Sequence, residues 1–225
     1  MPFLLPRVLP VMEPAARRPL KVRDTALAQG IARALSRTPL TPNQISLLSM
    51  LFALCAALCF WQVHARPAST VWLLPAALFI QLRLLCNLFD GMVAVEGGKH
   101  TPAGELYNDM PDRVADALIL VAAGYACPVP WGVELGWSAA LLAVMTAYVR
   151  TLSASIGAPV DFSGPMAKQQ RMALLTTACL GGMFEGGLSG SPLYSLTLAL
   201  AIIILGTLLT LVRRTLTACH FLEQR

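Results

Sequence analysis

Six apolar segments, each about as long as a membrane-crossing helix, follow one another along this chain of 225 residues. They cover residues 44–63, 71–94, 106–127, 133–155, 172–190 and 193–212. A helix needs about 20 apolar residues to cross the hydrocarbon core of a bilayer. The gaps between the segments are short, so we expect neighbouring helices to be antiparallel. The sequence therefore predicts an all-α integral membrane protein with six transmembrane helices.

The composition excludes an ordinary soluble domain and a disordered chain. Only 13% of the residues are charged and 56% are hydrophobic, whereas soluble domains carry about 25% charged residues. The six cysteines form no CxxC pair and lie mostly inside apolar runs, which indicates neither a disulfide framework nor a zinc site. We expect membrane lipids as partners and no nucleic acid.

The cations lie mostly on one side of the predicted membrane domain. The two termini and the loops at 95–105 and 150–171 hold nearly all of them, whereas the other side holds only Arg66, Glu134 and Glu185. The positive-inside rule then predicts that both termini are cytoplasmic. No internal repeat is visible, which argues against a transporter built from inverted repeats.

The chain divides into a basic N-terminal segment at 1–43, a membrane domain at 44–213 and a short cytoplasmic tail at 214–225. Within the first segment, residues 24–37 have the pattern of an amphipathic helix, whose apolar side holds Leu27, Ile31, Ala34 and Leu35. Such a helix would lie along the membrane surface and meet anionic headgroups. For residues 1–20 a solvated basic tail is the alternative.

Polar residues cluster at the cytoplasmic ends of the second and third predicted spans. The cluster consists of two amides and three carboxylates: Asn87, Asp90, Asn108, Asp112 and Asp116. Its members are three or four residues apart within each span, so each span presents them on one helix face. Three small residues beside them leave room for a ligand: Gly91, Ala94 and Gly104. Glu105 and Asp109 are expected to face water at the helix start, where negative charge suits the helix dipole.

Ionisable groups inside membrane helices are costly and usually functional. Several carboxylates in such a site cannot all stay charged unless a cation joins them. Oxygen ligands favour a hard cation such as Mg²⁺, Mn²⁺ or Ca²⁺, which suits phosphate chemistry. In a purely structural alternative, the carboxylates pair with Arg83 and Arg113 as buried ion bridges. This alternative accounts for one or two carboxylates but not for the whole set of polar and small residues.

The stretch NLFDGMVAVEGGKHTPAGELYNDMPDRVAD resembles the signature of the CDP-alcohol phosphatidyltransferases, D-x2-D-G-x2-A-R-x8-G-x3-D-x3-D. The spacing matches without a gap, and the signature falls on Asn87, Asp90, Gly91, Ala94, Val95, Gly104, Asn108 and Asp112. Thr41-Pro42-Asn43 resembles the TPN motif that precedes the first span of that family. The resemblance covers most of the chain, apart from residues 1–20.

Three positions depart from the signature. Its first and third aspartates are Asn87 and Asn108 in this chain, and its arginine is Val95. In the family the first three aspartates bind the metals and the fourth is the general base. An amide keeps a carbonyl ligand but carries no charge, and Asp116, one turn beyond the base position, restores one charge. We interpret the chain as a divergent member with a rearranged metal shell. The alternative is a catalytically silent homologue that binds CDP-lipid.

The resemblance implies a metal-dependent reaction in phospholipid synthesis. A phosphatidyl group would pass from CDP-diacylglycerol to a small alcohol, CMP would leave, and Asp112 would accept the proton of the alcohol. The metal, Mg²⁺ or Mn²⁺, would be held by Asp90, Asn87, Asn108, Asp112 and Asp116. The nucleotide would lie against Gly91, Ala94, Gly104 and Thr41.

A second basic region supports phosphate binding. Lys168 and Arg171 precede the fifth predicted span and share one helical face, and Arg150 lies near the end of the fourth. The resemblance implies that they contact lipid or acceptor phosphate, while the general alternative is a set of cations that fix the topology.

The sequence leaves open the type of transfer reaction, the acceptor and the oligomeric state. The shared signature also fits a CDP-alcohol phosphotransferase with diacylglycerol as acceptor. Glycerol 3-phosphate, inositol phosphate, serine, glycerol and another phospholipid all suit a polar site with cations nearby. The resemblance implies a homodimer, which the paired glycines at 181–182 and 186–187 allow.

Overall fold

The structure, a computed structural model, describes residues 21–67, 69–99, 101–189 and 194–224, and it contains helices but no strand within these ranges. Two short 3-10 helices lie at Lys21–Asp24 (η2) and Thr70–Trp72 (η3). The α-helices are α1 (Ala26–Ser36), α2 (Pro42–Ala65), α3 (Leu73–Glu96), α4 (Gly104–Tyr125), α5 (Gly132–Ser155), α6 (Lys168–Ser189) and α7 (Tyr194–Glu223). The predicted basic tail at residues 1–20 lies outside the described residues.

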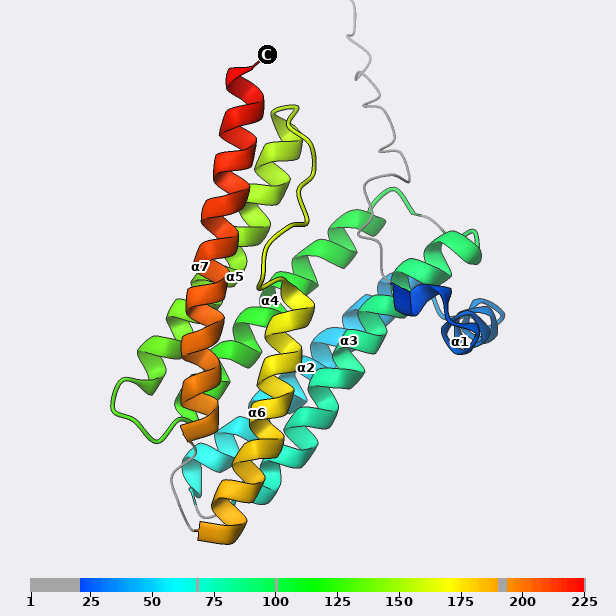
Figure 1. The fold of residues 1–225 in the computed structure, drawn as a ribbon. Helices are drawn as coiled ribbons and strands as arrows, with labels where there is room; N and C mark the ends of the chain where they lie inside the picture. The colour runs from blue at the N-terminus through cyan, green and yellow to red at the C-terminus, as the bar shows by residue number, and fades with distance from the viewer. Residues whose placement is uncertain (1–20, 68, 100, 190–193, 225) are drawn as a thin grey trace, which may run out of the picture.

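The six long helices form a closed ring of neighbours (Figure 1). Going round the bundle, α2 packs against α4, α4 against α5, α5 against α7, α7 against α6, α6 against α3, and α3 against α2. The core between them contains apolar side chains from all six helices, including Phe60, Ile80, Leu120, Ala140, Leu175 and Leu200. This arrangement confirms the prediction of an all-α protein for the described residues.

Small residues bring α4 and α5 into close contact. A Cβ atom added at Gly124 would lie 2.6 Å from the carbonyl oxygen of Gly132 and 2.7 Å from Cα of Gly136. The two backbones therefore touch where the chain turns from one helix into the next. This contact fixes α4, the helix that carries most of the predicted carboxylates.

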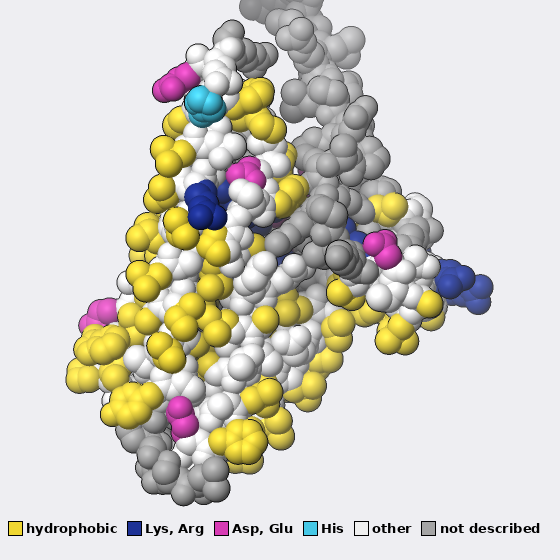
Figure 2. Space-filling view, in the orientation of Figure 1, with side chains coloured by type: hydrophobic (Ala, Val, Ile, Leu, Met, Phe, Trp, Pro, Cys, Tyr) yellow, Lys and Arg dark blue, Asp and Glu magenta, His cyan; other side chains and the backbone are white. Residues whose placement is uncertain are grey.

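Four of the helical segments are long and apolar enough to cross a membrane: Pro42–Ala65, Thr70–Val95, Gly132–Ser155 and Tyr194–Glu223. Charged and polar side chains lower the hydropathy of α4, and α6 begins with the polar sequence KQQR. Hydrophobic side chains cover much of the bundle on the face shown in Figure 2. The fold is thus that of a helical bundle with at least four candidate spans in its described part.

The predicted amphipathic helix is present as α1, which is capped by the Thr25 side chain. It lies beside the end of α3, outside the ring (Figure 1). Its small face, Ala28 and Ala32, is buried against Leu88, Phe89 and Met92 of α3. The larger apolar residues of the helix, Leu27 and Ile31, stay exposed.

The last helix is longer than the sequence predicted. It was expected to end near residue 212 but continues to Glu223, because no glycine or proline interrupts the chain between residues 207 and 225. The segment at 214–225, predicted as a tail, is therefore helical in most of its length. At the start of α2, Thr41 and Gln44 form a reciprocal capping box with Pro42 in the first turn.

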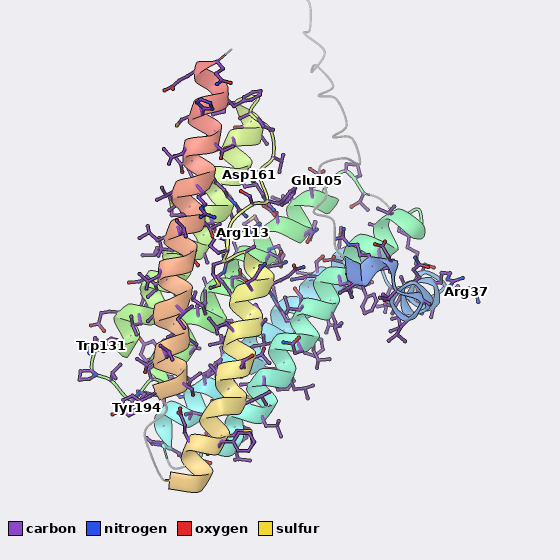
Figure 3. All side chains as sticks on the ribbon, in the orientation of Figure 1. Arg37, Glu105, Arg113, Trp131, Asp161 and Tyr194 are labelled. Atoms are coloured by element: carbon purple, nitrogen blue, oxygen red, sulfur yellow. The ribbon has the colours of Figure 1, made fainter. Side chains whose placement is uncertain are left out.

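The two ends of the bundle differ in their exposed groups. Figure 3 places Trp131 and Tyr194 toward one end of the bundle, and Glu105, Arg113 and Asp161 away from that end. The sequence predicts the cytoplasmic loops on the side away from Trp131 and Tyr194.

Candidate active site

The structure brings Asp112 of α4 together with donors from two other helices. Asn87 of α3 donates its amide N–H to Oδ1 of Asp112, and Nη2 of Arg83 lies 3.1 Å from the same oxygen. Lys168, the first residue of α6, donates its ammonium group to Oδ2. The Asp112 side chain is only 8% exposed. Both carboxylate oxygens are therefore held in place by residues that are far apart in the sequence.

Asp116 lies one turn further along α4 and faces two arginines. Nη2 of Arg83 is 2.7 Å from its Oδ1, and Nη2 of Arg171 is 2.9 Å from its Oδ2. All three side chains are almost completely buried, with 0 to 3% exposure. Such a buried network is maintained only when each charge keeps its partners. The sequence analysis gave buried ion bridges to Arg83 as a structural alternative. Two carboxylates, Asp112 and Asp116, do form such bridges.

Asp90 of α3 is also buried but contacts neutral donors. The hydroxyl of Ser46 on α2 donates to Oδ2 at 2.6 Å, and the backbone N–H of Gly91 donates to Oδ1. Asp90 lies three residues after Asn87 on α3, and Asn87 donates to Asp112, so Asp90 adjoins the same site. The donors that hold Asp90 within the described residues, the Ser46 hydroxyl and the Gly91 N–H, are neutral.

A separate ion-pair group lies nearer the exposed end of α4. Asp109 accepts from Arg113 at 2.6 Å and from Arg150 at 2.7 Å, and the Arg150 guanidinium stacks over the ring of Phe162 at 5.9 Å. Asp109, expected to face water, is 41% exposed at its side chain, and two arginines, one from α4 and one from α5, also contact it. Arg150, predicted to bind phosphate, lies in this second group.

The remaining predicted residues differ in how far they are exposed. Asn108 is exposed, Ala94 and Gly104 are half-buried, and Thr41 is exposed and caps α2. A Cβ atom added at Gly91 would meet nothing closer than Nη2 of Arg23, at 4.0 Å. Open space therefore adjoins the backbone next to Asp90.

The loop before α6 determines where Lys168 lies. Nε of Arg214 donates to the carbonyl oxygen of Ser163 at 3.0 Å, and the backbone N–H of Met166 donates to the Thr210 hydroxyl at 3.0 Å. Gly164 has a φ of +119° and packs against Thr210, where a Cβ atom would lie 2.4 Å from a side-chain carbon. Helix α7 thus fixes the loop before α6, and this places Lys168 within contact of Asp112.

The donor set was tested for its fit to a divalent cation. Within the described residues, no three His, Cys, Asp or Glu side chains are arranged to hold a metal ion. Asp116 faces two arginines, which leaves Asp90, Asp112 and the amide carbonyls as oxygen donors. Mg²⁺ is commonly held by one or two carboxylates, with waters and substrate phosphates completing its octahedron. The residues present therefore fit one such ion.

Two contributors were not predicted as site residues. Ser46 lies on α2, and its contact with Asp90 depends on how α2 packs against α3. Arg83 was considered only as a structural ion-pair partner, although its spacing of four from Asn87 places both on one face of α3. The available signal was Arg83 itself, the only Lys or Arg in the largely apolar segment 71–94.

The chain was compared with known families and structures. The sequence model described as CDP-alcohol phosphatidyltransferase matches residues 39–212. A phosphatidylinositol phosphate synthase of Streptomyces avermitilis is 27% identical over 203 residues, which is 86% of this chain and 78% of that protein.

Solved structures of the phosphatidylinositol phosphate synthase of Mycobacterium tuberculosis share the fold. The structure with bound CDP-DAG superposes with a TM-score of 0.67 and 19% identity, covering 86% of this chain and 94% of the other. The structure with manganese and citrate gives a TM-score of 0.68 and 19% identity, covering 84% and 88%. At this identity the likeness concerns the fold.

Proposed function

Because this chain belongs to the CDP-alcohol phosphatidyltransferase family, we propose that it transfers a phosphatidyl group from CDP-diacylglycerol to an alcohol and releases CMP. The observation that carries this proposal is the position of Asp112, a buried carboxylate oriented by three donors beside Asp90. A proton acceptor held in this way, next to a second carboxylate, is the arrangement that phosphoryl transfer to a hydroxyl requires.

In the proposed reaction the hydroxyl oxygen of the acceptor attacks the phosphorus that bears the lipid. A new P–O bond forms, the bond to CMP breaks, and CMP leaves with the bonding electron pair. Asp112 takes the hydroxyl proton through one of its carboxylate oxygens. Asn87 and Arg83 hold the other oxygen and fix the orientation of the carboxylate during the transfer.

Metal binding is assigned to Asp90, Asp112 and the carbonyl oxygens of Asn87 and Asn108. When bound, Mg²⁺ or Mn²⁺ would neutralise charge on the transferring phosphate. The Ser46 hydroxyl fixes Asp90 for this role. The geometry does not favour Asp116 as a metal ligand, because two guanidinium groups face its oxygens. The manganese found with a relative concerns that relative and supports the choice of ion only by analogy.

Nucleotide and acceptor are assigned to opposite sides of Asp112. The space beside Gly91, with Ala94, Gly104 and Thr41 nearby, suits the cytidine diphosphate group. Lys168 is the cation closest to the proposed base and suits a phosphate on the acceptor. Arg171, which is paired with Asp116, and Arg150, which is paired with Asp109, add positive charge to this region. A phosphorylated alcohol is thus the proposed acceptor, and the names of the relatives make inositol phosphate the first to test.

The membrane arrangement is part of the same proposal. We assign α2 to α7 as six transmembrane helices with both termini and the site at the cytoplasmic face. Exposed Leu27 and Ile31 suit contact of α1 with the membrane surface. A homodimer is proposed from family resemblance, with exposed apolar helix faces available for it.

The test is CMP release from CDP-diacylglycerol by the purified protein in lipid nanodiscs. The acceptors are inositol phosphate, glycerol 3-phosphate, glycerol and serine, each with Mn²⁺ or Mg²⁺. We expect metal-dependent CMP release with one phosphorylated acceptor. Asp112→Ala and Asp90→Ala should abolish it, while Glu134→Gln, at the opposite end of the bundle, should retain it.

A parallel reaction separates the rival transferase. CDP-choline or CDP-ethanolamine is supplied with diacylglycerol, and CMP is measured again. CMP release only in this reaction would replace the proposal by a CDP-alcohol phosphotransferase. Binding of CDP-diacylglycerol without CMP release from any acceptor would indicate a silent binding protein, which the amides at 87 and 108 make the specific alternative.

A further inference from the structure

The charges around the proposed base are nearly balanced by side chains alone. Three buried carboxylates, Asp90, Asp112 and Asp116, interact with three cations, Arg83, Lys168 and Arg171. Each member comes from α3, α4 or α6. In a site of low dielectric constant, a balanced set is far less costly than one with net charge.

Arg83 has a central place in this network. Its side chain is completely buried, and its Nη2 reaches Oδ1 of Asp112, the backbone carbonyl of Asp112 and Oδ1 of Asp116. Among the described residues, its Nε and Nη1 atoms have no hydrogen-bond partner. Arg83 is one helical turn before Asn87, where the family signature has an aspartate. The positive charge of Arg83 therefore lies next to residue 87, where this chain has a neutral amide in place of the aspartate of the family signature.

We infer that this site binds a single divalent cation, with the Arg83 guanidinium supplying positive charge that a second ion would otherwise bring. The inference rests on the proposed function and concerns its metal stoichiometry. In the complex with a CDP-lipid and no acceptor, one dication and the diphosphate dianion together add no net charge to the balanced set. Two dications would leave an excess of two positive charges in that complex.

Neighbouring residues make a second ion still less favourable. Asp116 already faces Arg83 and Arg171, so neither of its oxygens is directed to an open ligand position. Asp90 is held by neutral donors, and Oδ2 of Asp112 faces the partly exposed Lys168 rather than a buried arginine. These two carboxylates therefore remain for a metal ion, and two carboxylates suffice for one Mg²⁺ or Mn²⁺.

The test is a titration of the purified full-length protein with Mn²⁺ in the presence of CDP, which cannot undergo phosphatidyl transfer. Free Mn²⁺ is measured by electron paramagnetic resonance. We expect about one bound ion per chain in the wild type, as two carboxylates allow. Asp90→Asn should lose this ion. Asn87→Asp combined with Asn108→Asp should bind about two ions, because two ligand charges return.

Asn108→Asp alone, at an exposed position, serves as the variant that carries little risk to folding. Two Mn²⁺ ions in the wild type, or no bound ion, would overturn the inference. A double variant that folds and still binds one ion would also overturn the inference. The number of bound ions would then not depend on whether residues 87 and 108 are carboxylates or amides. The CMP assay separates the two proposals: Mn²⁺-dependent CMP release with two bound ions rejects the inference alone. One bound ion without CMP release from any acceptor rejects the transferase and supports the stoichiometry.

Discussion

Arg83 on α3 and Asp116 on α4 form an ion pair of 2.7 Å in the interior of the bundle, where their side chains are 0% and 2% exposed. The same guanidinium group contacts the proposed base, Asp112, at 3.1 Å. A residue that holds the bundle together therefore also orients the carboxylate that is assigned to the chemistry. The stability of this region and its activity should be coupled for that reason.

Removing Asp116 should destabilise the protein strongly. Asp116→Ala leaves Arg83 and Arg171 without their shared carboxylate, and breaking a buried pair costs about 3–5 kcal/mol. Thermal unfolding in detergent measures the effect. Asp109→Ala is the matched control, because Asp109 also binds two arginines but its side chain is 41% exposed, so its loss should cost about 1 kcal/mol or less. Equal destabilisation by both changes would argue against a buried network.

Asp112→Asn tests the proton-accepting role without a change of shape. The amide keeps the volume of the side chain but cannot take the hydroxyl proton, so kcat should fall by about 10²–10⁴. Binding of CDP-diacylglycerol, measured separately, should change much less. A variant with full kcat would show that another group accepts the proton.

Ser46→Ala tests the support that Asp90 receives from α2. The hydroxyl at 2.6 Å orients this carboxylate, and loss of such an outer partner weakens metal affinity by about 10–100-fold. Titration with Mn²⁺ detects the change. Ser49→Ala is the control, since Ser49 is equally buried but donates to the backbone of its own helix. An unchanged affinity in Ser46→Ala would remove Asp90 from the proposed metal ligands.

Two glycines should respond in opposite ways to alanine. At Gly91 a Cβ atom meets nothing nearer than 4.0 Å, so Gly91→Ala should fold normally and raise the KM for the CDP-lipid. At Gly124 a Cβ atom would lie 2.6 Å from the carbonyl oxygen of Gly132, so Gly124→Ala should destabilise by about 1–3 kcal/mol. Thermal unfolding and KM, measured for both variants, separate space kept for substrate from space needed for helix packing. A normal KM in Gly91→Ala would contradict the assignment of the nucleotide to this side.

Lys168→Gln should separate phosphorylated from neutral acceptors. A hydrogen bond to a charged group contributes about 1.5–3 kcal/mol, so KM for a phosphorylated acceptor should rise by roughly 10–100-fold. KM for glycerol should change little. Arg113→Gln is the comparison, because Arg113 contacts Asp109 rather than Asp112. An equal rise in KM for the phosphorylated acceptor and for glycerol would mean that Lys168 acts only by positioning Asp112.

The sequence predicted most helices well because their apolar runs are long and their ends carry clear signals. The spacing of the signature also relates Asn87 to Asp112, and these two residues are in contact in the structure. The signature also located the correct family. These features are local, so they can be read without knowledge of the packing.

The partners of the carboxylates were harder to predict, because they depend on contacts between distant segments. Ser46 reaches Asp90 only through the packing of α2 on α3, and Lys168 reaches Asp112 only because α7 fixes the loop before α6. Periodicity also predicted Leu27 and Ile31 on the apolar face of α1, whereas Ala28 and Ala32 are the residues that pack on α3. Small residues allow the closest helix contact but contribute little to a hydrophobic pattern.

The central claim is tested most directly by measuring CMP and the new lipid phosphodiester in one reaction. The wild-type protein and Asp112→Asn are compared with CDP-diacylglycerol, inositol phosphate and Mn²⁺, and the lipid is identified by mass spectrometry. The account predicts equal amounts of CMP and phosphatidylinositol phosphate from the wild type and almost none from the variant. CMP and the lipid product formed at the same rate by Asp112→Asn would contradict it.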